Sequence, residues 1–265
     1  MSEGSIQAVL IDISGVLSVG GEPVGEAVAA LEKLRGAGKK VRFLTNTTRK
    51  PRRALVESLT SQGFELEVGE VFTAPLAARR LLEQQRLRPH LLVHPDVKED
   101  FEGLSTDRPN AVVVGDAGDA FTYGSLNAAF RVLMGGEGDD EQEPAVLISM
   151  GSNRYFRDGD GKLSLDMGPF VAALEFAGGV KAKVTGKPAK AFFRGALQDL
   201  GVRPSEAVMI GDDLPNDIGG AEAAGVTGVL VRTGKFCPAD EHDDEVHPEA
   251  VCDDFAEAVT WVLNH

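Results

Sequence analysis

Short strand-like runs alternate with helix-like segments along most of the chain of 265 residues. Short, mainly apolar runs are typical of strands buried in a parallel sheet, and the helices between them connect one strand to the next. The pattern predicts an α/β fold with a mainly parallel sheet. Four of these runs are followed at once by polar residues with chemical potential: 8–13, 41–44, 181–185 and 208–210.

The middle third of the sequence differs in character. It holds an acidic, glycine-rich segment at 135–143 and a predicted hairpin at 155–165, whose turn is Asp158-Gly159-Asp160-Gly161. None of the four polar segments lies between about 80 and 183. We therefore expect a core formed by 1–80 and 184–265, with a cap domain at 81–183 that excludes water and selects the substrate. One larger continuous sheet is the alternative.

Helices and further strands complete the prediction. Helices are expected over 24–34, 51–63, 76–85, 122–134, 189–200 and 216–224, and further strands over 91–94, 111–115, 145–150 and 226–231.

The charge balance limits the partners. A net charge of −14 argues against nucleic acid, because binding to a phosphate backbone needs clustered Lys and Arg. The negative net charge also repels an anionic substrate. Such a substrate needs a site where a metal and a cation make the local charge positive. The polar N-terminus and the lack of an apolar run near about 18 residues argue against a leader or a membrane. Two cysteines without ligand spacing indicate a reduced, cytoplasmic setting.

Carboxylates occur at two of the predicted strand ends. Asp12 can bind Mg²⁺ through one oxygen and attack phosphorus with the other, and a main-chain carbonyl near Ser14 can add a ligand. Taken alone, a simple turn aspartate is the better explanation of Asp12. Asp212, Asp213 and Asp217 repel one another unless a cation lies among them, although acidic residues also favour helix starts.

Neutral donors and a lysine follow the other two predicted strands. Thr45 and Asn46 can bind phosphoryl oxygens without adding negative charge, and Lys187 can neutralise phosphate and orient a nucleophile. A helix cap before Pro51 and a solvated surface lysine are the alternatives for these positions. Only the four segments together favour a site for Mg²⁺ and a phosphoryl group.

Several stretches of the sequence carry a family resemblance. They are LIDISGVL at 10–17, VRFLTN at 41–46, VLIS at 146–149, VMIGDD at 208–213 and VRTGKF at 231–236. In this order they resemble the haloacid dehalogenase superfamily of phosphatases, over nearly the whole chain. The stretch VRTGKF has no catalytic role that its residues suggest, so it serves here as a family marker.

The resemblance implies a Rossmann-like core with an inserted α/β cap, a phosphatase activity and Mg²⁺ as cofactor. It implies that Asp12 is the nucleophile and that Asp12, the main-chain oxygen of Ser14 and Asp212 bind the metal. In the cycle that we expect, Asp217, together with Asp213, orients the outer shell of the ion.

The resemblance also assigns the phosphate-binding roles. It implies that Thr45, Asn46 and Lys187 contact the phosphoryl group of a phosphorylated substrate. Phosphatases of this kind are often homodimers through the cap, so a homodimer is expected.

Ser14 departs from the wider superfamily, which mostly has a second aspartate there as general acid and base. A serine is a poor proton donor, so we hypothesise a preference for leaving groups that depart readily. These are P–N bonds, as in phosphohistidine, phospholysine and imidodiphosphate, and pyrophosphate. Ser14 as a plain turn residue, with Asp213 or a water in its place, stays open. The alternatives are a phosphatase of sugar or aryl monoesters and a weakly catalytic protein that binds a phosphorylated partner.

Overall fold

The computed structural model describes residues 5–135, 145–157, 159 and 161–265. These residues form two compact units, each with its own sheet. The core unit contains the described residues up to Thr45, together with Arg52–Phe72 and Lys187–His265. The second unit contains Asn46–Pro51 and the described part of Thr73–Gly186. In the described chain no strand is shared between the two sheets, so the alternative of one continuous sheet is wrong.

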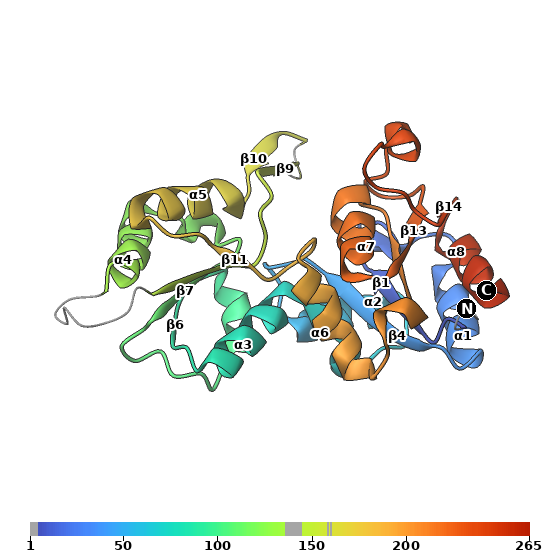
Figure 1. The fold of residues 1–265 in the computed structure, drawn as a ribbon, viewed down its shortest axis with the longest axis horizontal. Helices are drawn as coiled ribbons and strands as arrows, with labels where there is room; N and C mark the ends of the chain where they lie inside the picture. Colours follow the sequence, from blue (N-terminus) through green and yellow to red (C-terminus); the bar gives the residue numbers. More distant parts are fainter. Residues whose placement is uncertain (1–4, 136–144, 158, 160) are drawn as a thin grey trace. The chain divides into compact units, whose positions relative to one another are not determined.

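The core unit is built on a six-stranded sheet in the order β14-β13-β12-β1-β4-β5 (Figure 1). The pairings of β1 with β4 and β12, and of β13 with β12 and β14, are parallel, which confirms the predicted fold class. The strands are β1 (Ala8–Asp12), β4 (Lys40–Thr45), β5 (Val71–Thr73), β12 (Ala207–Gly211), β13 (Thr227–Val231) and β14 (Ala250–Cys252).

The register of this sheet sets the position of the site. Ile11 pairs with Ile210 and Asp12 with Leu44, so the carboxyl ends of β1, β12 and β4 lie side by side. All five residues of β1 are buried, as expected for a strand with helices on both faces of its sheet.

Helices cover this sheet. They are α1 (Ala27–Gly36), α2 (Arg52–Ser61), α6 (Lys190–Leu200), α7 (Gly220–Ala224) and α8 (Phe255–Asn264), with short helical turns at Val68–Glu70, Pro204–Glu206 and Pro238–His242. A small hairpin joins β2 (Ser18–Val19) to β3 (Glu22–Pro23). The main apolar core contains Val9, Ile11, Leu31, Phe43 and Phe255, and therefore lies between one face of the sheet and helices that include α1 and α8. The predicted helix at 216–224 instead starts as a wide, π-type helical segment, Leu214–Gly219, and continues as α7.

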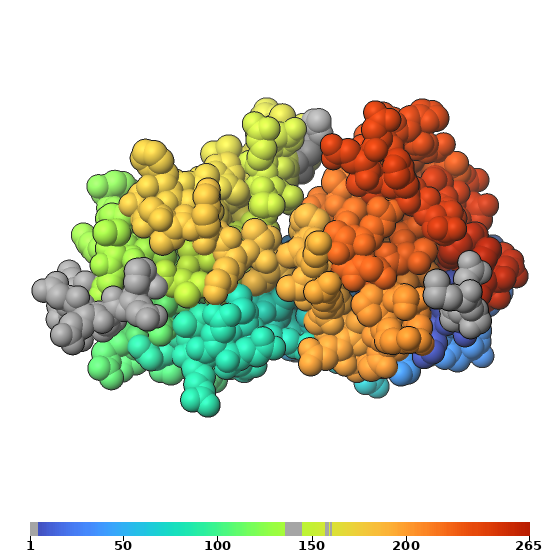
Figure 2. Space-filling view, in the orientation of Figure 1, coloured from blue at the N-terminus to red at the C-terminus, as the bar shows by residue number. Residues whose placement is uncertain are grey.

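The second unit has a four-stranded sheet in the order β11-β8-β7-β6, again parallel. Its elements are β6 (Pro89–Leu92), β7 (Ala111–Val114), β8 (Val146–Ser149), β11 (Lys183–Val184), α3 (Ala74–Gln85), α4 (Tyr123–Leu133) and α5 (Met167–Gly178), with short helical turns at Pro95–Phe101 and Gly118–Ala120. Separate apolar clusters join the sheet to α3 and to the pair α4 and α5, so the helices cover both faces. Side chains of α5 form part of the visible surface of this unit (Figure 2).

The predicted hairpin is confirmed, because β9 (Tyr155–Arg157) pairs antiparallel with β10 (Leu163–Leu165). Its turn residues Asp158 and Asp160 lie outside the described residues, as does nearly all of the acidic segment predicted at 135–143. That the second unit acts as a cap with bounds 81–183 stays a prediction. In the described chain, every helix is too short or too polar to cross a bilayer.

Candidate active site

Three buried carboxylates meet in the core unit. Asp12, Asp212 and Asp217 each offer an oxygen, and these atoms lie within 4.8 Å of one another. Asp12 ends β1 and Asp212 directly follows β12, and because the two strands pair in parallel, their ends coincide. Asp217 comes from the helical segment after β12 and is fully buried. The sheet thus brings together residues from both ends of the sequence.

Lys187 joins this cluster. Its ammonium nitrogen is ion-paired with Oδ1 of Asp12 and lies 2.5 Å from Oδ1 of Asp217, and the lysine side chain is only 5% exposed. Burial alone would lower the pKa of Lys187, but the charges of Asp12 and Asp217 outweigh burial and raise it. Lys187 is therefore a permanent cation beside the proposed nucleophile.

The carboxylates carry more negative charge than this lysine can balance. Burial raises the pKa of Asp12, and it raises the pKa of Asp212 to about 6 and that of Asp217 to about 7. Burial, together with the charge of a neighbouring aspartate, thus disfavours the charged form of each carboxylate. Carboxylate oxygens are hard ligands of the kind that Mg²⁺ prefers, so these residues fit a divalent cation.

Two glycines allow the close approach of the carboxylates. A Cβ on Gly211 would lie 2.3 Å from Cβ of Asp217, and one on Gly15 would lie 2.0 Å from Oδ2 of Asp212. Both distances are far below van der Waals contact, so a side chain at either position would displace an aspartate. Gly15 also has a φ of +93°, a conformation that favours glycine.

Asp213 has partners of its own. It caps the helical segment by accepting hydrogen bonds from the main chain and side chain of Asn216, and Oδ2 accepts one from the Lys235 ammonium at 2.8 Å. Burial alone would raise the pKa of Asp213, but the charge of Lys235 and these hydrogen bonds outweigh it and lower the pKa. Asp213 is thus an anion that is already paired.

The other expected site residues lie at two places. Ser14 is exposed in the loop after β1, and Thr45 is a buried residue at the end of β4, next to the partner of Asp12. Asn46 belongs to the second unit, where its Oδ1 lies 2.6 Å from the position of a Cβ on Gly186. The structure therefore gathers Asp12, Lys187 and two of the later aspartates, while roles for Ser14, Thr45 and Asn46 stay predictions.

The loop after β13 is a part of the site that sequence reasoning missed. The Thr233 hydroxyl donates a hydrogen bond to the carbonyl of Gly15, and the Lys235 main-chain N–H donates one to Oδ2 of Asp212 at 2.7 Å. The stretch VRTGKF was noted only as a family marker. A signal was present, because it follows a predicted strand and so reaches the sheet edge where ligands bind.

Two pockets are lined by described residues of the second unit. A small one of about 220 Å³ is lined by residues that include Asn46, Arg49 and Asp116. The Arg49 guanidinium lies 2.6 Å from the Asp116 carboxylate and 5.3 Å from the centre of the Phe156 ring. These contacts hold the arginine beside a pocket whose lining includes Asn46, one of the expected phosphate-binding residues.

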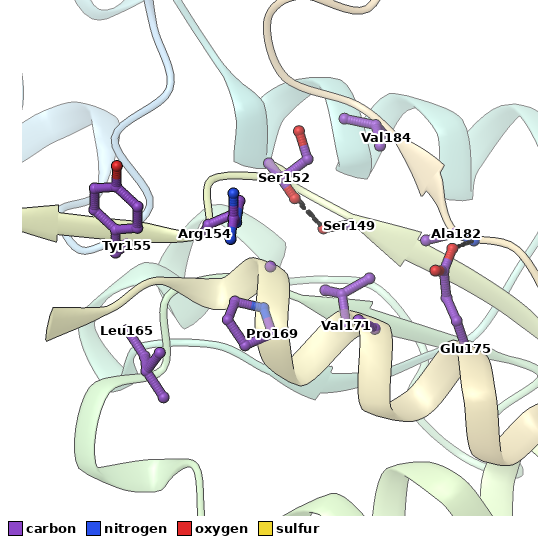
Figure 3. A pocket seen from close by; sticks show the side chains of 13 residues that line it. Ser149, Ser152, Arg154, Tyr155, Leu165, Pro169, Val171, Glu175, Ala182 and Val184 are labelled. Carbon is purple, nitrogen blue, oxygen red and sulfur yellow. Dashed lines mark hydrogen bonds between the residues drawn. The ribbon is translucent and has the colours of Figure 1, made fainter.

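The larger pocket, of about 510 Å³, is mainly apolar (Figure 3). Pro169 and Val171 contribute from α5, Val184 from β11, and Tyr155 and Leu165 from the hairpin. No carboxylate cluster like that of the core unit is found in it among the described residues.

Comparison with known proteins places the chain in a family. A haloacid dehalogenase-like hydrolase model matches residues 9–106, and a HAD-hydrolase-like model matches residues 184–258. The phospholysine phosphohistidine inorganic pyrophosphate phosphatase of Bos taurus is 47% identical over 264 residues, which cover 98% of this chain and 95% of that protein. The chain belongs to the haloacid dehalogenase-like hydrolase family. This confirms the resemblance seen in the sequence, and the protein is a hydrolase of the phosphatase type.

Solved structures agree with this haloacid dehalogenase-like fold. The 4-nitrophenylphosphatase of Thermotoga maritima superposes with a TM-score of 0.86 at 25% identity, covering 97% of each chain. A glycerol phosphate phosphatase of Mycobacterium tuberculosis in complex with magnesium has a TM-score of 0.81 at 27% identity, over 95% of this chain and 78% of that one.

Proposed function

We propose that this chain is a Mg²⁺-dependent phosphatase that forms an aspartyl-phosphate at Asp12 and favours P–N bonds and pyrophosphate. The observation that carries the proposal is the buried cluster in which Asp12 lies with two further aspartates and the Lys187 ammonium. The magnesium complex of the Mycobacterium relative and the name of the Bos taurus relative support the cofactor and the substrate class.

Asp12 acts as the nucleophile in this proposal. One carboxylate oxygen attacks phosphorus, and the bond to the leaving group breaks with its electron pair on that group. Lys187 favours the charged form of Asp12 and, with Thr45 and Asn46 as donors, neutralises the transferred phosphoryl oxygens. A water then hydrolyses the aspartyl-phosphate, which releases phosphate and restores Asp12.

The residues that would hold the metal are Asp12, the main-chain oxygen of Ser14 and Asp212. Asp213 and Asp217 complete the set as outer-shell groups that orient these ligands. When bound, Mg²⁺ supplies positive charge that stabilises the phosphoryl oxygens.

The preference for P–N bonds rests on Ser14. The residue is exposed, and its hydroxyl does not titrate near neutral pH, so it is a weak proton donor to an alkoxide. An imidazole, an amine or a phosphate leaves with less protonation.

Two alternative functions remain. The names of the Thermotoga and Mycobacterium phosphatases favour a monoester substrate, and the missing second aspartate favours a weakly catalytic protein that binds a phosphorylated partner.

The second unit is proposed as the cap and as the surface of a homodimer. Its exposed apolar side chains support this, since Phe176 is 93% exposed and Tyr155, Leu163 and Leu165 are each more than half exposed. Mass determination by light scattering, with Phe176→Asp as the variant, tests the dimer. A cytoplasmic location and the lack of nucleic-acid and membrane partners stay predictions from the sequence.

Phosphate release under single-turnover conditions tests the function. With Mg²⁺ we expect release from imidodiphosphate at least tenfold faster than from glycerol phosphate, and none from Asp12→Asn, which should keep its circular dichroism spectrum. Equal rates on both substrates would contradict the leaving-group preference. Retained activity in Asp12→Asn would contradict the nucleophile, and binding without release by the wild type would favour the phospho-partner protein.

A further inference from the structure

The loop Thr233–Gly234–Lys235 touches the candidate metal site at three points. The Lys235 main-chain N–H donates to Oδ2 of Asp212, and the Lys235 ammonium donates to Oδ2 of Asp213. The Thr233 hydroxyl donates to the carbonyl of Gly15 in the loop that follows the proposed nucleophile. One short loop therefore contacts both the loop after β1 and the acidic segment after β12. Neither the family assignment nor the proposed cycle assigns a role to it.

Glycine backbones close around one oxygen of Asp212. A Cβ on Gly234 would lie 1.9 Å from Oδ2 of Asp212 and 2.6 Å from Cα of Gly15. A Cβ on Gly15 would lie 2.0 Å from the same oxygen, and both glycines have positive φ angles, +93° for Gly15 and +58° for Gly234. The main chain at both glycines thus lies so close to Oδ2 that neither position tolerates a side chain.

The second oxygen of this carboxylate has a different environment. Within the residues that the structure describes, Oδ1 of Asp212 accepts no hydrogen bond, whereas Oδ2 is held by the Lys235 N–H. A carboxylate that is fixed through one oxygen presents the other in one direction. A cation then meets a preformed ligand, and it need not order a mobile side chain against neighbouring negative charges.

We infer that the loop Thr233–Gly234–Lys235 is a positioning element, which fixes Asp212 through Oδ2 and leaves Oδ1 for the divalent cation. The inference rests on the metal site of the proposed function. The Lys235 ammonium anchors the loop by binding the Asp213 carboxylate. Lys235 therefore acts through other residues and does not touch the substrate. A loop that only stabilised the core would affect unfolding and leave the affinity for Mg²⁺ unchanged.

Titration calorimetry with MgCl₂ on the whole protein tests this inference. In Gly234→Ala the new Cβ displaces Asp212, and we expect the Kd for Mg²⁺ to rise about 10- to 100-fold, as for lost supporting contacts at metal sites. In Lys235→Met the main-chain N–H remains but its anchor is lost, so we expect a smaller rise of about tenfold. Saturating Mg²⁺ should then restore kcat in Lys235→Met.

Matched variants separate positioning from folding. Lys235→Arg keeps a cation opposite Asp213 and should bind Mg²⁺ within about threefold of the wild type. Gly36→Ala, at an open position in α1 with nothing within 4 Å of the new Cβ, should bind as the wild type does. Melting temperatures in EDTA report any general loss of stability.

The outcomes are distinguishable. If Gly234→Ala does not fold, the Kd of Lys235→Met for Mg²⁺ tests the positioning role by itself. Folded variants that bind Mg²⁺ as tightly as the wild type overturn the positioning role and leave the proposed function intact. A wild type that binds no Mg²⁺ overturns the proposed metal site, and the inference falls with it.

Discussion

The ammonium group of Lys187 contacts two carboxylates, those of Asp12 and Asp217, and all three side chains are at most 8% exposed. A buried cation between two buried anions has a double effect. It favours the ionised form of Asp12, the proposed nucleophile, against the effect of burial, and it offsets the repulsion between the two carboxylates.

Replacing Lys187 by Met should therefore reduce both activity and stability. Removing one partner of a buried ion pair costs about 3–5 kcal/mol, and loss of a group that stabilises transition-state charge lowers kcat by about 10²–10³. Thermal unfolding and phosphate release measure the two effects. Lys33→Met, at an exposed position of α1, is the control and should change neither. Wild-type kcat in Lys187→Met would contradict the assigned role.

Removing the metal should lower the melting temperature of the wild type. A ligand that binds only the folded state stabilises it by about 2.7 kcal/mol at one hundred times its Kd. We expect 10 mM MgCl₂ to raise the melting temperature and EDTA to reverse the shift. Asp212→Asn should lose most of the shift, while Asp107→Asn, an exposed aspartate of the second unit, should keep it. An equal shift in Asp212→Asn would place the ion elsewhere.

A methyl group at Gly211 should disturb Asp217 without removing any functional group. The new Cβ would lie 2.3 Å from Cβ of Asp217, so one of the two segments must move. Overpacking of this kind costs about 1–3 kcal/mol, and displacing Asp217 should lower kcat at least about tenfold. Gly36→Ala adds the same methyl group in open space and should be neutral. Matched activities of the two variants would show that the position of Asp217 is unimportant.

Stability should depend on pH through Asp166 in the second unit. This residue caps α5 by accepting a hydrogen bond from the Met167 N–H, and burial raises its pKa. A raised pKa in the folded state means that the folded protein binds more protons, so the stabilisation is complete below the unfolded pKa of about 3.9 and is lost as pH rises through the folded value. Asp166→Asn keeps the cap without a charge. Its melting temperature relative to the wild type should increase with pH, and a constant difference would contradict this.

Most of the long buried elements of the fold, though not α8, could be predicted from the sequence. The residues of β1 are continuously apolar up to Asp12, and a short run of this composition is typical of a strand buried in a parallel sheet. Strands of two or three residues, such as β5 and β14, carry too little pattern to be recognised, and neither was predicted. Helix α5 was missed as well, since Gly168 and Pro169 near its start disfavour a helix interior although Pro is accepted in the first turn.

The contacts of the candidate site could also be predicted only in part from the sequence. Strand ends in a parallel sheet meet at one edge, so the meeting of Asp12 with Asp212 could be expected. The contact of Asp217 with Lys187 depends on the wide helical segment after β12, which has no sequence signature. The hydrogen bond from Lys235 to Asp212 comes from the main chain, and every residue type except proline offers that donor.

The neighbours β1 and β12 are separated in sequence by the entire second unit. During translation, Asp12, the proposed nucleophile, therefore leaves the ribosome long before the strand that carries its carboxylate partner. A nascent chain, or a product of premature termination before residue 207, has Asp12 but neither Lys235 nor the later aspartates. The proposed mechanism therefore needs residues from both sides of the second unit, and polypeptides that end before residue 207 are expected to be inert.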